Sequence, residues 1–502
     1  MKGTESVRPG KYPLLCEFAP ALQVPEGKRV PFGWKSVAID SAASGTVTRF
    51  NWPHSANKSN FSATQAFLRI CTACDVREEK RIEVTLAGSG KLVGTFDIRY
   101  AYVHQIFEIP IPGEDMDAII NEGLDLRMAA GEQPFWMFCD PASSEIPDTL
   151  QPHVLLVGQN GGNDEIGENS EDDESGRSDR LAEFYVQLKS FSSIQPFGWL
   201  EGCVLDGLFQ LDAACPDNGW LDALLGHLRL YFPAGDKLVI ENHLSDISDG
   251  RFYSHESTLP LALITRVWPD HPIVEDAISF WQTNKHGMTT EGCYTVGYPL
   301  AVIAGQRGRA DLAELSVRIL LERKENLAAE WGVWQRQYMY RNWARACAWY
   351  TLGFTRSAIA LREANMALEQ LETVEQEIRR MAQVMMLSQR PDGLWSCFID
   401  EEATGPDTSG SAGIAAALAL GARHGILPDT VGAEAMAAAE RAFQALRHYL
   451  TPDGLLSGSA QNNRGGEALQ KSGYRTISQM AMGLMGQLAA ALPCPISQLQ
   501  GK

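Results

Sequence analysis

The second half of the chain repeats one two-helix unit, and this repeat constrains the fold more than any other feature. Each unit has an apolar stretch rich in small residues, a tight turn, and then a more amphipathic stretch. Four copies are clear, at residues 207–232, 259–281, 298–323 and 411–446. A helix that is apolar all round must be covered on most sides, whereas its amphipathic partner keeps one face in water. Such hairpins predict a closed toroid, and the length fits about a dozen helices, as in an (α/α)6 barrel.

The first part of the chain has a different pattern. Short segments rich in β-branched and aromatic residues are separated by glycine, proline and charged residues, which predicts a β-sandwich. Residues 159–180 are acidic and glycine-rich, with one isoleucine and no aromatic residue, so they suit a solvated spacer. We therefore expect a β-sandwich domain at 1–157, an acidic flexible linker at 158–181, and an (α/α)6-barrel catalytic domain at 182–502.

Charge and cysteine content exclude several classes of function. The 502 residues carry a net charge of -19, which disfavours partners such as nucleic acid or an anionic membrane surface. No stretch of about 18 apolar residues is present, and the N-terminus has no apolar signal region. Ten scattered cysteines do not resemble a disulfide framework or a metal site, so we expect a cytoplasmic protein without metal or cofactor. A homo-oligomer formed through the β-domain is left open.

Two glutamates are the candidates for catalysis. In a barrel of this kind the inner helices begin at one end, beside the loops that precede them. Glu256 and Glu291 have similar positions in consecutive repeats, each just ahead of a small-residue helix. Two carboxylates across a cleft suit glycosidic cleavage, because one donates a proton and the other activates water or attacks carbon. Each glutamate alone is explained equally well as a first-turn carboxylate favoured by the helix dipole.

Other polar and aromatic residues near the same helix starts are candidates for substrate binding. Arg345 and Trp349 lie four apart and share one helix face. The planar guanidinium of Arg345 suits a substrate carboxylate, although a buried structural ion pair is the alternative. Exposed indole rings suit the C–H faces of sugars, and core packing is again the alternative. The predicted substrate-binding residues are Trp199, His255, His286, Tyr294, Arg345, Trp349, Trp395, Asp407 and Ser409.

These residues carry a resemblance to known enzymes. Residues 343–349 read WARACAW, similar to the W-x-R-G-Q-A-W motif of the unsaturated glucuronyl hydrolases. Residues 407–417 are similar to a D-S-S-A-x-A-I-A run in the same enzymes, and Gly393–Trp395 matches a G-L-W motif of the unsaturated rhamnogalacturonyl hydrolases. Over most of residues 190–490 the chain resembles the (α/α)6-barrel uronic-acid glycoside hydrolases of families 88 and 105 and the related β-glucuronidases of family 154.

The resemblance implies an exo-acting glycoside hydrolase that takes a uronic-acid-containing oligosaccharide or glycoside. Families 88 and 105 have catalytic aspartates where this chain has Glu256 and Glu291, and they lack a preceding β-domain. These departures favour the family 154 type, which removes a terminal β-glucuronic acid. Arg345 would then bind the uronate carboxylate, and Trp349 or Trp395 would support the sugar ring.

Three other functions stay open. An unsaturated glucuronyl hydrolase would hydrate the 4,5 double bond of an unsaturated uronide. A polysaccharide lyase on the same toroid would need a tyrosine or histidine base near an arginine, and Tyr294, Tyr298 and His286 are candidates. A non-catalytic sugar-binding or scaffold protein would have Glu256 and Glu291 facing away from any cleft.

Overall fold

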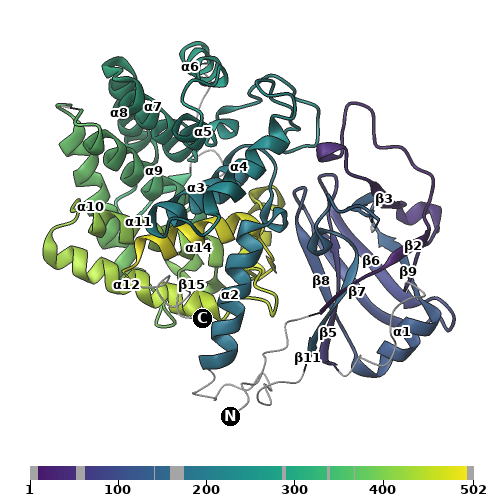
Figure 1. The fold of residues 1–502 in the computed structure, drawn as a ribbon. Helices are drawn as coiled ribbons and strands as arrows, with labels where there is room; N and C mark the ends of the chain where they lie inside the picture. Colours follow the sequence, from purple (N-terminus) through teal and green to yellow (C-terminus); the bar gives the residue numbers. More distant parts are fainter. Residues whose placement is uncertain are drawn as a thin grey trace.

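The structure, a computed structural model, describes residues 10–52, 63–140, 142–158, 174–284, 290–335, 340–366 and 368–493. In these residues a β-sandwich lies beside a ring of helices (Figure 1). The predicted fold class, a β-sandwich followed by an (α/α)6 toroid, is confirmed. None of the helices in these ranges is long and apolar enough to cross a membrane.

The sandwich is built from two antiparallel sheets. One has the order β1 (Gly10–Pro13), β11 (His153–Gly158), β5 (Ala63–Cys71), β8 (Ile106–Ile111). The other has the order β2 (Leu15–Phe18), β4 (Thr48–Asn51), β9 (Leu124–Ala130), β6 (Glu79–Leu86), β7 (Leu92–Arg99). β3 (Ser36–Ile39) pairs with β10 (Phe135–Phe138), and α1 (Met116–Glu122) precedes β9. Side chains alternate along β6, so Ile82, Val84 and Leu86 enter the core between the sheets.

Six inner helices form the closed ring of the helical domain in the described part of the chain. They are α3 (Trp199–Ala214), α5 (Leu261–Val267), α7 (Tyr298–Arg307), α9 (Ala344–Glu363), α11 (Thr408–Arg423) and α14 (Gln479–Ala491). Each packs against the next, and α14 packs back on α3. The outer layer holds α4 (Trp220–Tyr231), α6 (Ile273–Thr283), α8 (Ala310–Leu327), α10 (Leu371–Leu387), α12 (Asp429–Arg447) and α2 (Glu174–Lys189).

Shorter elements lie in the loops between the helices. They are the 3-10 turn His255–Thr258, the π turn Cys293–Gly297, α13 (Gly466–Lys471), and three small hairpins: β12 (Trp334–Gln335) with β13 (Tyr340–Arg341), β14 (Ser396–Phe398) with β15 (Glu401–Pro406), and β16 (Ser459–Ala460) with β17 (Arg475–Thr476). The 3-10 turn leads into α5 and the π turn leads into α7, so both lie at the N-terminal ends of inner helices.

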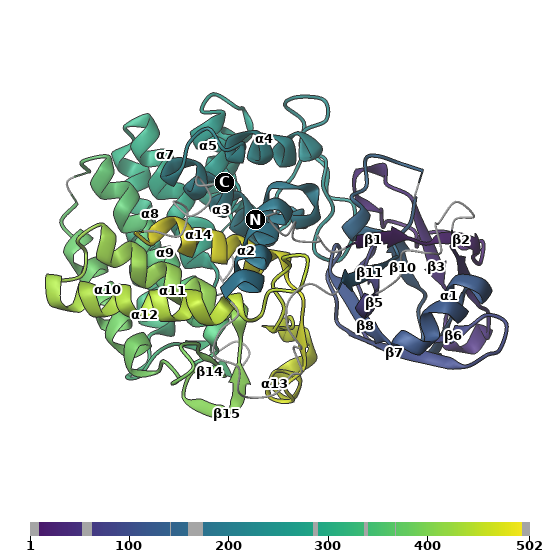
Figure 2. The same cartoon turned by 60° about the horizontal axis from the view of Figure 1, so that its bottom comes forward.

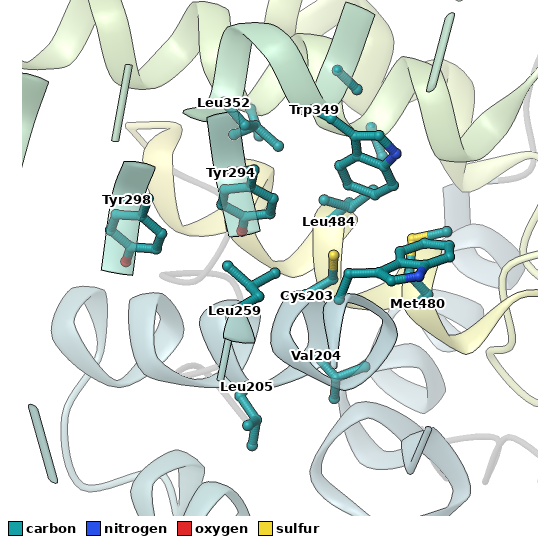
Figure 3. Packing of buried hydrophobic residues seen from close by; sticks show 14 of the residues in the cluster. Cys203, Val204, Leu205, Leu259, Tyr294, Tyr298, Trp349, Leu352, Met480 and Leu484 are labelled. Carbon is teal, nitrogen blue, oxygen red and sulfur yellow. The ribbon is translucent and has the colours of Figure 1, made fainter. Parts of the chain in front are cut away.

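Small residues let the inner helices approach closely. Where α3 crosses α14, a Cβ at Gly207 would lie 2.5 Å from the carbonyl oxygen of Gly483, so only glycine fits there. The inner helices are apolar on nearly every side, and α14 is buried along its whole length. Figure 3 shows part of this core, to which Leu259, Leu352 and Leu484 contribute from three different parts of the ring. The repeat of small apolar stretches therefore became the inner layer.

Helix α2 corrects the predicted domain boundary. The linker was expected to run from 158 to 181, but α2 begins at Glu174 and forms the outer partner of α14. Leu181, Phe184 and Leu188 of α2 are buried in the helical core, which gives this charged segment a reason to be helical. Residues 159–173 of the expected linker lie outside the described residues.

The sandwich packs against the barrel through apolar and charged contacts (Figure 2). Trp34, Val103 and Phe138 join the same buried cluster as the barrel helices. Arg69, which is fully buried, donates hydrogen bonds of 2.8 and 2.7 Å to both carboxylate oxygens of Asp453 in the barrel. The charged contact between the domains is therefore desolvated, so it is sensitive to the loss of either partner.

Candidate active site

A cleft of about 410 Å³ lies at the N-terminal end of the inner helices. It brings together five of the residues predicted from the sequence, Trp199, Glu256, Glu291, Arg345 and Trp349. The remaining lining residues are Tyr102, His243, Ser254, Trp343, Asn462, Asn463 and Arg464. A cleft of this volume can hold a sugar unit with part of its neighbour.

Glu256 and Glu291 reach the cleft from consecutive hairpins of the ring. Glu256 is half-buried in the 3-10 turn before α5, where the hydroxyl of Ser254 accepts a hydrogen bond from its backbone N–H at 3.2 Å. Glu291 is 9% exposed and precedes the π turn before α7. The hydroxyl of Thr258 donates a 2.7 Å hydrogen bond to the carbonyl of Thr295, which ties the two turns together. The backbone therefore holds both carboxylates at one mouth of the barrel.

Arg345 lies in the first turn of α9 and is only 3% exposed. Its Nε donates to the hydroxyl of Ser409 at 3.0 Å, and its Nη2 donates to the carbonyl of Ala460. Nη1 makes no hydrogen bond to the residues that the structure describes, and the side chain borders the cleft. This guanidinium is thus fixed by two neutral acceptors, and neither of these contacts neutralises its charge.

Asp407 and Ser409 lie behind Arg345 and not on the cleft surface. Both are fully buried. Asp407 caps α11 by accepting hydrogen bonds from the backbone N–H groups of Ser409 and Gly410, and it also accepts one from the Ser409 hydroxyl at 2.7 Å. The prediction that these two residues touch substrate is therefore corrected: they form a buried network that orients Arg345.

The predicted aromatic residues separate into two groups. Trp199 and Trp349 border the cleft and meet edge to face, with ring centroids 5.4 Å apart. Tyr294 lies beside Trp349 in the core (Figure 3), and the two rings stack with centroids 6.0 Å apart. The hydroxyl of Tyr294 donates to Asp206 at 2.6 Å. Trp395 is fully buried and donates its indole N–H to the carbonyl of Met385 at 2.8 Å. Tyr294 and Trp395 are therefore core residues, contrary to their predicted contact with substrate.

The structure describes one of the two predicted histidines, His255. The half-buried ring of His255 packs against Phe280 with centroids 5.3 Å apart, and His255 is not among the lining residues. His286 lies outside the described residues. No group of three histidine, cysteine, aspartate or glutamate side chains that could hold a metal ion was found among the residues that the structure describes.

Several lining residues were missed by the sequence reasoning. Asn462, Asn463 and Arg464 come from the loop before α13, where no helix start drew attention to them. His243 comes from the long α4–α5 connection, and its Nε2 faces Nη2 of Arg464 at 3.0 Å. Burial, followed by the nearby positive charge of Arg77, lowers the pKa of His243 to about 4, so at neutral pH its free nitrogen can accept from Arg464. Tyr102 was missed because it belongs to the sandwich.

Comparison with known protein families gives a match within the helical domain. Residues 322–497 match the model of Glycosyl Hydrolase Family 88. This range contains Arg345, Trp349 and the buried network of Asp407 and Ser409. A search of curated proteins found no significant match. The predicted resemblance to uronic-acid glycoside hydrolases, and with it the prediction of a glycoside hydrolase, is confirmed by the family match together with the fold.

Solved structures share the toroid at low sequence identity. A possible member of the GH105 family from Salmonella enterica serovar Paratyphi A is 13% identical, with a TM-score of 0.53, and the match covers 65% of this chain and 97% of that one. A family 88 glycosyl hydrolase from Bacteroides vulgatus is 14% identical, with a TM-score of 0.51 and coverage of 64% and 99%. A structure described as a polysaccharide lyase is 16% identical, with a TM-score of 0.51 and coverage of 65% and 99%. These similarities establish the fold of the helical domain.

Proposed function

We propose that the protein is an exo-acting glycoside hydrolase that removes a terminal β-glucuronic acid from an oligosaccharide or glycoside. The observation that carries the proposal is that two glutamates and one fixed arginine share a single cleft of sugar size. The carboxylates supply acid and base, while Arg345 recognises the charge that distinguishes a uronic acid from a neutral sugar. The family 88 match over residues 322–497 supports the same class of substrate.

In the hydrolytic reaction, one of Glu256 and Glu291 protonates the glycosidic oxygen as the bond to C1 breaks. The other carboxylate either activates a water molecule that attacks C1 or attacks C1 itself, and in the second case water then releases the sugar. Nη1 of Arg345 would pair with the uronate carboxylate. Trp199 and Trp349 would present apolar surface to the ring and keep water from the reacting centre.

A second candidate is hydration of a 4,5-unsaturated uronide, and the match to Glycosyl Hydrolase Family 88 favours it. Here one carboxyl group protonates C4 and the other directs water to C5. The double bond is consumed, and the resulting hemiketal opens and releases the neighbouring sugar. The same cleft residues would serve both reactions, so the choice depends on the substrate.

The bases predicted from the sequence for a lyase reaction have little support from the geometry. It requires a base beside the sugar, but Tyr294 and Tyr298 are both about 1% exposed and direct their hydroxyls at Asp206. His286, the third predicted base, lies outside the described residues. The cytoplasmic location and a homo-oligomer through the sandwich stay predictions.

The proposal is tested by giving the purified protein a chromogenic β-D-glucuronide and, separately, a 4,5-unsaturated uronyl disaccharide. Release of the chromophore supports hydrolysis of a saturated glucuronide. Loss of the double-bond absorbance in deuterated water, with deuterium found at C4 of the product, identifies hydration. Inactivity on both substrates would contradict the proposed function, and a new double bond formed on an intact uronate polymer would establish the lyase.

A further inference from the structure

We propose that Tyr102, a residue of the β-sandwich, binds the substrate uronate, so that the sandwich is part of the active site. This inference rests on the proposed function of the cleft. Tyr102 lines the same cleft as Glu256, Glu291 and Arg345. Among the described residues that line the cleft, it is the one that comes from the sandwich, and its place there follows from how its loop is held.

The side chain of Tyr102 is set for contact with a ligand. Its ring meets Trp199 edge to face, with centroids 6.0 Å apart and planes at 82°. Its backbone N–H is bonded to Oε1 of Gln105 at 3.3 Å, whereas its hydroxyl has no hydrogen-bond partner in the described ranges. The phenol and the indole therefore lie side by side in the lining of the cleft.

The loop that carries Tyr102 is bonded to the barrel on both sides. Before Tyr102, the carbonyl of Arg99 accepts a 2.8 Å hydrogen bond from Nε2 of Gln461. After it, the carbonyl of His104 accepts a 2.6 Å hydrogen bond from Nε2 of Gln479, which lies in the first turn of α14. The loop is therefore fastened to the same barrel end that holds the cleft, and a movement of Tyr102 would break these bonds.

The backbone of this loop also stores strain. Tyr100 has φ of 49° and His104 has φ of 65°, the left-handed region that residues other than glycine seldom adopt. The ring of His104 stacks between Phe32 and Phe138, with centroids 5.8 and 5.2 Å away, and this packing holds the conformation. Strained residues kept in place by their surroundings often position a functional side chain, and here they flank Tyr102.

Charges around Tyr102 keep its hydroxyl a donor. Burial raises the pKa of Tyr102 most, and the negative charge of Glu256 raises it next. Arg345 lowers the pKa by less than Glu256 raises it, and Glu291 adds a smaller increase. A phenol that stays protonated can donate to an anionic ligand. A uronate carboxylate bound by Arg345 is such a ligand, so Tyr102 and Arg345 would bind it from two different domains.

The sandwich wall is an addition to the shared toroid. About two thirds of this chain covers almost the full length of the similar solved structures. The helical domain makes up about the same share of this chain. Tyr102 therefore adds to this cleft a lining residue that does not come from the helical domain. The consequence is a contact that depends on the docking of the two domains.

The experiment compares wild-type protein with Tyr102→Phe, which removes only the hydroxyl. Tyr474→Phe is the matched control, because Tyr474 also bridges the domains, with its hydroxyl donating to the carbonyl of Asp97 at 2.8 Å, but does not line the cleft. We expect Tyr102→Phe to lower kcat/KM on the uronide about tenfold or more, mainly through KM, as for the loss of a hydrogen bond to a charged group. Its Tm should equal that of wild type, and Tyr474→Phe should stay within about twofold of wild type in kcat/KM.

Calorimetric titration with D-glucuronate separates this inference from the proposed function. If wild type hydrolyses neither uronide yet binds glucuronate about tenfold more tightly than Tyr102→Phe does, the binding role stands and the catalytic proposal falls. Equal kcat/KM and equal Kd for wild type and Tyr102→Phe would overturn the inference, even if wild type is an active hydrolase. Absence of glucuronate binding and of activity in wild type would overturn it as well.

Discussion

Nε of Arg345 donates a hydrogen bond to the hydroxyl of Ser409 at 3.0 Å, and this bond joins two motifs 64 residues apart in the chain. Asp407 holds Ser409 in turn, with 2.7 Å between its carboxylate oxygen and the hydroxyl. The three residues form a chain from the cap of α11 to the cleft. The arginine motif and the motif at residues 407–417 are thus two parts of one arrangement that holds a guanidinium at the cleft.

Replacement of Arg345 by lysine should remove recognition of the carboxylate. An ammonium group is a point charge that cannot bond Ser409, Ala460 and a ligand in one plane. We expect kcat/KM on a uronide to fall roughly 100-fold, the equivalent of about 2.7 kcal/mol, while activity on a neutral glycoside does not decrease. Arg341→Lys, at an exposed position outside the cleft lining, is the control and should behave as wild type. A lysine variant that keeps full kcat/KM would contradict the carboxylate role.

Conversion of either cleft glutamate to glutamine should abolish turnover. Glu256→Gln and Glu291→Gln each remove a group that gives or takes a proton, so we expect kcat to fall about 1,000-fold or more. The glutamines are nearly isosteric, so circular dichroism and Tm should change little. Glu402→Gln, at an exposed position in β15, controls for the change of charge. Full activity in both cleft variants would remove the pair from the mechanism.

Asp206, a carboxylate of α3 that neither proposed reaction uses, should prove structural. It is fully buried, 3.0 Å from Nε of Arg356, and accepts from the hydroxyl of Tyr294. Asp206→Asn leaves a buried arginine without its counter-charge, so we expect the free energy of unfolding to fall by about 3 kcal/mol. Urea denaturation measures this loss. Asp212→Asn, on the same helix α3 but partly exposed, is the control. An unchanged urea midpoint with lost activity would instead make Asp206 catalytic.

The buried pair between the domains should make their docking sensitive to acid. Burial alone would raise the pKa of Asp453, but the charges of Arg69 and Lys11 outweigh it, so the pKa lies below its ordinary value. Because the folded pKa is the lower one, this stabilisation is complete above the unfolded pKa of about 4 and is lost as the pH falls below it. Asp453→Asn should therefore cost stability at neutral pH, and its difference from wild type should shrink as the pH falls below about 4.

The chain supplies a matched control for this prediction. The sequence Pro-Asp-Gly-Leu occurs twice, at residues 391–394 and 452–455, so Asp392 has the same local sequence as Asp453. The side chain of Asp392, however, is 43% exposed and pairs with Arg390 on the surface. Asp392→Asn should change the free energy of unfolding by less than about 1 kcal/mol at any pH. Thermal melts from neutral pH down to pH 3 compare the two variants. A constant difference between Asp453→Asn and wild type across this range would show that the pair does not govern the acid response.

Much of the fold could be predicted because the sequence pattern of each helix and strand depends on residues close together in the chain. The inner helices of the ring had to be rich in small residues, since Gly207 and Gly483 lie at a helix crossing that leaves no room for a Cβ. The start of α2 could not be found in the same way. Its first turns are charged like the segment before them, and only the burial of Leu181 and Phe184 against the barrel makes it a helix.

The residues of the candidate site that could be predicted are those at the N-terminal ends of the inner helices. Glu256, Glu291 and Arg345 stand at or just before the first turns of inner helices, and those turns share one end of the ring. Tyr294 and Trp395 were predicted to contact substrate, but both are buried in the core. Which way a side chain points depends on the rotation of its helix or turn within the ring, and packing between helices sets that rotation.

The sequence by itself determined the ring of hairpins, the sandwich and the end of the barrel where a cleft could form, because residue spacing and side-chain size act within one helix or strand. The tertiary structure alone decided which side chains face the cleft. It buried Asp407 and Ser409 behind Arg345, and it brought Tyr102 from the sandwich to Trp199. Contacts between distant segments depend on the docking of whole domains, and no local pattern encodes that docking.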